Sequence, residues 1–100
     1  MIVFNRVSSV APGKMASAMA FAKNIASYMN EAYGTDMKLH MPVGGGNPYR
    51  IAWTSTFADL AAVDAMQTKT LTDPKFQELL AKNAENFLPG SARDSMWRQV

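Results

Sequence analysis

The stretch DMKLHMPVGGGNPYRIAWTST, residues 36–56, holds two alternating patterns on either side of a glycine-rich segment. In the first pattern, residues 36–43, the odd-numbered positions are Met37, Leu39, Met41 and Val43, and the residues between them are polar or proline. In the second, residues 49–56, Tyr49, Ile51 and Trp53 alternate with Arg50, Ala52 and Thr54. A period of two is typical of half-buried strands, and glycines supply the positive φ angles that a reversing chain needs. The stretch therefore predicts a β-hairpin.

The three glycines have a second interpretation, as a nest that binds an anion. Loops that cradle phosphates lead into a helix, whose first N–H groups face the anion. This loop leads into a strand, and the hairpin is therefore the interpretation that we prefer.

The segments before the hairpin predict a strand and a long helix. Residues 1–7, MIVFNRV, contain β-branched and aromatic residues at close spacing, which is typical of a strand. We expect the helix to open near Pro12, since proline suits the first helical position. Small and apolar residues then recur at helical spacing over residues 15–33, and Gly34 is expected to end the helix.

The segments after the hairpin predict two helices and a last strand. Residues 56–59, TFAD, resemble a capping box and open an alanine-rich helix to about residue 71. Asp73 and Pro74 are expected to start a second helix. Its buried face is predicted to contain the apolar residues Phe76, Leu79, Leu80, Ala84 and Phe87. Residues 94–100, DSMWRQV, close the chain as a strand.

The resulting order, βαββαβ with the second helical region split in two, predicts a ferredoxin-like α+β fold in one domain, residues 1–100. Its four antiparallel strands carry the helices on one face. Large apolar residues fall on both faces of the predicted strands, and the pattern does not decide which face meets the helices. Because a monomer rarely exposes a large apolar patch, we expect a homodimer that pairs the uncovered sheet faces.

Composition excludes several classes of function. The chain has no cysteine, one histidine, ten Lys and Arg and eight Asp and Glu, for a net charge of +2. Disulfides and thiolate chemistry are excluded, and we expect neither a metal nor a cofactor. The basic residues form no block, and the third predicted strand lacks the signature of RNA-recognition domains, so we expect no nucleic-acid binding. Without a leader-like or membrane-spanning apolar stretch, a cytoplasmic protein that binds no membrane is predicted.

Three residues near the hairpin are candidates for chemistry. His40 is the only imidazole and is the candidate general base, although a strand histidine near a turn is commonly a surface residue. Arg50 is a candidate substrate-binding residue, expected opposite His40 across the hairpin. Trp53 provides a flat wall for an aromatic ligand, or else fills the core.

Three more candidates lie on the first and last predicted strands. Trp97 is a second possible aromatic wall, with the dimer interface as its alternative role. Asn5 is polar in an apolar strand and needs a partner, either a ligand or the protein itself. Arg6, like Arg98, either binds a substrate carboxylate or pairs with an acidic residue such as Asp94.

The order of elements and three segments, APGK (residues 11–14), WTSTFADLAAVDAM (53–66) and LTDPKFQELLAKNAENFLPGSARDSMWR (71–98), resemble the dimeric α/β-barrel superfamily. Within it the chain most resembles NIPSNAP-like domains, with antibiotic-biosynthesis monooxygenase-like domains as neighbours. Those domains commonly carry Arg-x-Tyr before the Pro-Gly; Arg6 matches the arginine, and Ser8 stands in place of the tyrosine. The resemblance implies a homodimeric barrel with a pocket between sheet and helices in each protomer.

Members of this superfamily include cofactor-free oxygenases and isomerases as well as domains without assigned activity, so fold alone does not choose among them. Two hypotheses follow. The first is an oxygenase- or isomerase-like enzyme for a small hydrophobic or aromatic molecule. The second is a non-catalytic domain for ligand binding or dimeric assembly.

Overall fold

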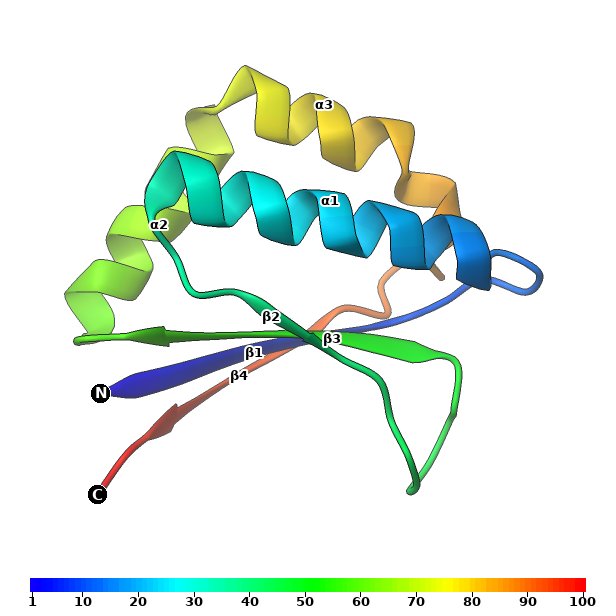
Figure 1. Cartoon of the computed structure of the whole chain (residues 1–100), viewed down its shortest axis with the longest axis horizontal. Coiled ribbons are helices and arrows are strands. Elements are labelled where there is room, and N and C mark those ends of the chain that lie inside the picture. The colour runs from blue at the N-terminus through cyan, green and yellow to red at the C-terminus, as the bar shows by residue number, and fades with distance from the viewer.

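The computed structural model describes all residues from 1 to 100 and has the predicted ferredoxin-like architecture (Figure 1). The elements in chain order are β1 (Ile2–Ser9), α1 (Met15–Tyr33), β2 (Lys38–His40), β3 (Arg50–Phe57), α2 (Leu60–Thr72), α3 (Pro74–Lys82), the short 3₁₀ helix η1 (Ala84–Asn86) and β4 (Arg93–Arg98). The strands form one antiparallel sheet in the order β2-β3-β1-β4. All helices lie on one side of it (Figure 1).

The connection into α1 differs from the sequence prediction. The helix begins at Met15, and Pro12 lies in the turn before it. The N–H of Lys14 donates to the carbonyl of Ala11 at 3.1 Å, and Gly13 has φ of 74°. Proline followed by a glycine with positive φ is the sequence of a type II turn, which explains why Pro12 does not open the helix.

The starts of α2 and α3 depend on aspartates. The side chain of Asp59 accepts a hydrogen bond from the N–H of Ala62, which makes Asp59 itself the N-cap of α2. The predicted capping box began at Thr56 and had Asp59 as its last residue, so α2 starts about one turn later in the chain than predicted. Asp73 caps α3 as predicted, accepting from the N–H groups of Lys75 and Phe76, with Pro74 in the first turn.

The helix-facing side of the sheet holds the core. On β3, Ile51 and Trp53 are 0% and 7% exposed, and Phe4 on β1 is 4% exposed. Fully buried alanines on α1, at Ala18 and Ala22, let that helix lie close to the sheet. Helix α1 packs on β2 and β3, whereas α3 packs on α2 and η1. The sheet beneath α3 is therefore less tightly covered.

The other face of the sheet carries no helix (Figure 1). Register places Trp97 of β4 beside Val3 of β1 on this open face, and Trp97 is 68% exposed. The prediction of large apolar residues on both faces is correct only for β1 and β4. On β2 and β3 the large apolar residues face the helices, because Leu39 pairs with Trp53 on the buried side.

Strand β2 is shorter than the predicted span of residues 36–43. Asp36 does not join the ladder, because its carboxylate accepts hydrogen bonds from the Ser55 hydroxyl at 2.9 Å and from the N–H of Thr56 at 2.8 Å. At the other end of β2, residues 41–49 form an exposed loop, so the hairpin is confirmed but its turn is long. No helix of the chain is both long and apolar enough to cross a membrane.

Candidate functional site

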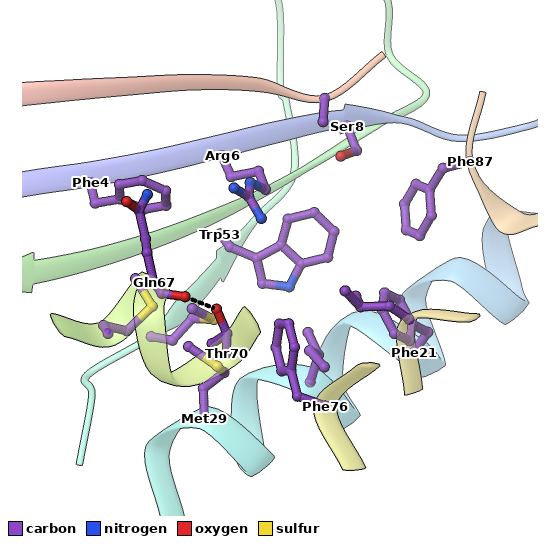
Figure 2. A pocket seen from close by; sticks show the side chains of 15 residues that line it. Phe4, Arg6, Ser8, Phe21, Met29, Trp53, Gln67, Thr70, Phe76 and Phe87 are labelled. Carbon is purple, nitrogen blue, oxygen red and sulfur yellow. Dashed lines mark hydrogen bonds between the residues drawn. The ribbon is translucent and has the colours of Figure 1, made fainter. Parts of the chain in front are cut away.

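A cavity of about 250 Å³ lies between the sheet and the helices (Figure 2). Eleven of its fifteen lining residues are hydrophobic, and the lining comes from β1, β3, all three α-helices and the connecting segments that hold Met37, Phe87 and Ala92. Trp53, Phe76 and Phe87 contribute aromatic side chains (Figure 2). The walls therefore suit an apolar or aromatic molecule.

The cavity exists because α3 stands away from the sheet. Among the lining residues, Arg6, Leu80 and Ala92 are exposed to solvent, and they lie on β1, on α3 and just before β4. These three residues mark the mouth of the cavity. A molecule would enter between α3 and the β1–β4 half of the sheet.

Arg6 is the only charged residue in the lining. Its Nε and Nη2 donate to the two carboxylate oxygens of Asp94 at 2.7 and 2.8 Å, so the pair is bidentate. These hydrogen bonds from Arg6 lower the pKa of Asp94, and the same contact raises the pKa of Arg6. The predicted alternative that Arg6 pairs with Asp94 is thus confirmed, and the third guanidinium nitrogen, Nη1, has no partner within the chain.

The remaining polar lining residues are Ser8, Gln67 and Thr70. The Thr70 hydroxyl is used within α2, where it donates to the Gln67 carbonyl at 2.8 Å (Figure 2). None of the fifteen residues is an aspartate, glutamate, histidine, lysine, cysteine or tyrosine. The lining can hold a largely apolar molecule and donate hydrogen bonds to an acceptor atom on it. It offers no group that exchanges protons near neutral pH.

The structure divides the six predicted site residues between separate places. Arg6 and Trp53 line the cavity, where they are cross-strand neighbours. Trp53 also donates a long hydrogen bond of 3.4 Å to the carbonyl of Ala22. Trp97 lies on the opposite face, and the two tryptophans therefore do not form two walls of one pocket.

Asn5 and His40 lie together on the open face. His40 Nδ1 is 3.2 Å from the Thr54 hydroxyl, which in turn donates to the side-chain oxygen of Asn5 at 3.4 Å. The chain of contacts crosses β2, β3 and β1. The sheet separates His40 from the cavity, so it cannot act as a base on a molecule held there.

Arg50 is not paired with His40, contrary to the prediction. The register places Ala52 opposite His40, because β2 ends there and the ladder does not reach Arg50. The Arg50 guanidinium instead donates to the carbonyls of Gly45 and Asn47 at 2.6 and 2.5 Å. Arg50 therefore holds the hairpin loop in place.

Several residues that line the cavity were not predicted as site residues. Phe76 and Phe87 have helical spacing, which signals burial but not whether the buried side faces a filled core or a void. Ser8 lines the cavity next to Arg6 on the same face of β1. The alternation of β1 could have marked Ser8, because a small polar residue among buried apolar ones leaves space.

A second polar cluster joins α1 to α3. The Tyr28 and Tyr33 hydroxyls both donate to Oδ2 of Asp73, the former at 2.5 Å. Hydrogen bonds from the two tyrosines lower the pKa of Asp73 to about 2, and the bond to Asp73 raises the pKa of Tyr28. Because Asp73 also caps α3, the cluster ties the start of α3 to α1.

A scan against protein-family models finds no match for this chain, and a search of curated proteins finds none either. Solved structures do match. A NIPSNAP domain protein from Burkholderia xenovorans has a TM-score of 0.83 at 13% identity, over 100% of this chain and 95% of its own. A NIPSNAP family protein from Agrobacterium tumefaciens has a TM-score of 0.81 at 14% identity, over 99% and 92% of the two chains.

An antibiotic biosynthesis monooxygenase also matches, with a TM-score of 0.73 at 12% identity over 100% of this chain and 99% of its own. At these identities the matches establish a shared fold. The chain therefore has the ferredoxin-like fold of NIPSNAP and monooxygenase-like domains, in agreement with the resemblance found in the sequence.

Proposed function

We propose that this protein binds a small hydrophobic or aromatic molecule in the cavity between its sheet and its helices, and that it does so as a homodimer. The apolar cavity carries the proposal, because eleven of its fifteen lining residues are hydrophobic and Trp53, Phe76 and Phe87 contribute aromatic walls. Unfilled apolar space of this size costs stability, and a well-formed apolar pocket is the usual place for a small ligand. Binding is favoured over catalysis, since no lining residue can take or give a proton near neutral pH.

The size of the cavity supports a small ligand. An apolar cavity of about 150 Å³ holds one benzene ring. At about 250 Å³, this cavity has room for about two fused rings or a short branched chain. We expect molecules larger than three rings to bind only if α3 moves outward.

Binding can be measured at the two tryptophans of the chain. We expect 2-acetylnaphthalene, added to ¹⁵N-labelled protein, to shift the indole N–H signal of Trp53 and to leave that of Trp97 in place, because only Trp53 lines the cavity. The variant Trp97→Phe assigns the two signals. If neither signal moves, or only that of Trp97 does, the proposed site is wrong.

A blocked variant provides the control. Ser8 is 8% exposed and lines the cavity, and the variant Ser8→Tyr places a ring in that space. We expect this variant to remain folded and to lose the shift of Trp53. Full binding by Ser8→Tyr would mean that the probe lies elsewhere.

The homodimer is supported by the open face of the sheet. Trp97 is 68% exposed there and lies beside Val3, and a second copy of the sheet would cover both. Light scattering is expected to give twice the mass of one chain, and Trp97→Glu is expected to give a single chain. A monomeric mass for the unmodified protein at micromolar concentration would contradict the dimer.

A further inference from the structure

We infer that Asp94 determines the specificity of the cavity: by neutralising Arg6, it makes the site select uncharged carbonyl compounds over carboxylates. This inference rests on the proposed function and names the class of ligand more closely. The expected ligand has about two rings, or an equivalent apolar body, and one ketone, aldehyde, ester or amide oxygen.

The register of the sheet fixes the arrangement. Arg6 of β1 lies between Asp94 on β4 and Trp53 on β3, each its direct cross-strand partner. The side chain of Arg6 extends along the helix-facing side, where it also covers the ring of Phe4 at 5.8 Å. The guanidinium is therefore held by the Asp94 carboxylate, lies over the Phe4 ring and lines the cavity (Figure 2).

The ion pair leaves donor groups for a ligand. Asp94 accepts one N–H from Nε and one from Nη2, so three of the five guanidinium N–H groups have no acceptor in the chain, namely both on Nη1 and the second on Nη2. Asp94 does not line the cavity. A bound molecule thus meets a fixed hydrogen-bond donor at the mouth but not the carboxylate behind it.

Charge decides which acceptor suits this donor. The charge of Arg6 is already balanced by Asp94, and no second cationic residue is in the lining. A carboxylate ligand at this half-exposed mouth would have to displace Asp94 or lie near the Asp94 carboxylate with no second cation to balance it, and like charges repel. A carbonyl oxygen accepts from Nη1 without adding charge.

Three probes of the same size test the inference on the unmodified protein. They are 2-acetylnaphthalene, 2-naphthoate and 2-isopropylnaphthalene, which have equal numbers of non-hydrogen atoms and differ in the group beside the rings. We expect the ketone to bind about tenfold more tightly than the hydrocarbon, because it gains a charge-assisted hydrogen bond, and at least about tenfold more tightly than the carboxylate. Titration of the Trp53 signal at pH 7 gives all three affinities.

The variant Asp94→Asn tests the role of the charge. It keeps the size of the side chain and removes the neutralising charge from Arg6, so we expect 2-naphthoate to bind more tightly than 2-acetylnaphthalene in this variant. Asp64→Asn is the matched control, because Asp64 is exposed on α2 with no ion pair and its replacement changes the net charge equally. We expect Asp64→Asn to keep the order of the unmodified protein.

The outcomes separate this inference from the proposed function. If all three probes bind with equal affinity, or the carboxylate binds best to the unmodified protein, the inference is overturned while the cavity remains a binding site. If no probe moves the Trp53 signal, both are overturned. The comparison on the unmodified protein stands even where Asp94→Asn does not fold, and an unchanged order of affinities in a folded Asp94→Asn overturns the role of Asp94.

Discussion

The two tryptophans of the chain allow the two sides of the sheet to be tested by the same change. Trp53 is 7% exposed on the helix side, and Trp97 is 68% exposed on the open side. Truncation of each to alanine removes the same atoms from opposite environments. We expect Trp53→Ala to destabilise the fold of one chain, and Trp97→Ala to destabilise the dimer.

The magnitude for Trp53→Ala follows from its surroundings. Truncation of a buried tryptophan costs about 3–5 kcal/mol. Trp53 also loses its contact with the ring of Phe87 at 5.9 Å, which is worth about 1 kcal/mol within that total. One side of the indole already faces the cavity, where it lacks partner atoms, so we expect a value of about 3 kcal/mol.

Trp97→Ala has a different signature. In a single chain this side chain makes few contacts, and a surface substitution changes stability by less than about 0.5 kcal/mol. In a homodimer, unfolding is coupled to dissociation, so the apparent stability rises by about 1.4 kcal/mol for a tenfold rise in protein concentration. We expect this dependence in the unmodified protein and in Trp53→Ala, and its loss in Trp97→Ala.

Urea unfolding followed by circular dichroism, at two protein concentrations tenfold apart, measures both effects. With a slope m of about 1.5 kcal/mol per molar urea, Trp53→Ala lowers the midpoint by about 2 M. A midpoint for Trp53→Ala within about 0.5 M of the unmodified protein would refute the assignment of Trp53 to the core and cavity wall. Midpoints that do not depend on concentration in any of the three proteins would refute the dimer.

Two further predictions concern the elements that hold the site. Because the pKa of Asp73 is about 2 in the folded chain and 3.8 is its ordinary value, the stabilisation from its ionised form is fully present above about pH 4 and is lost as pH falls through about 2. We expect the stability of Asp73→Asn, measured by thermal unfolding, to depend less on pH in this window than that of the unmodified protein. The same pH dependence in both proteins would contradict the stabilising role of the Asp73 carboxylate. Gly34 ends α1 with φ of 67°, so Gly34→Ala is expected to cost about 1 kcal/mol, whereas Gly44→Ala, at a position without positive φ and with free space around it, is expected to cost almost nothing. Equal losses of stability in the two variants would show that the positive φ of Gly34 does not explain the cost of Gly34→Ala.

The sequence predicts the order of elements well because periodicity and caps are local. Residues 15–33 form the predicted helix with its expected end before Gly34, although it begins at Met15 rather than near Pro12, and Asp73 with Pro74 starts α3 as expected. The errors lie where a non-local contact competes with a local pattern. Strand β2 is short because Asp36 binds Ser55 and Thr56, which are distant in sequence.

The site is harder to predict than the fold. Trp53 and Trp97 look alike in the sequence, since each lies in a predicted strand between one apolar and one polar neighbour, and only the packing of α1 on β3 decides which one is buried. The cavity is a gap left by α3, and a gap has no sequence pattern. Arg6 is a candidate in the sequence because its guanidinium can bind a carboxylate, but its free Nη1 depends on the register with Asp94.

A crystal structure of the protein with bound 2-acetylnaphthalene tests the central claim most directly. We predict the naphthyl rings between Trp53 and Phe76 in the cavity, with the ketone oxygen within hydrogen-bond distance of Arg6 Nη1 and the pair between Arg6 and Asp94 intact. Rings bound on the open face beside Trp97, with the cavity between sheet and helices empty, would contradict it.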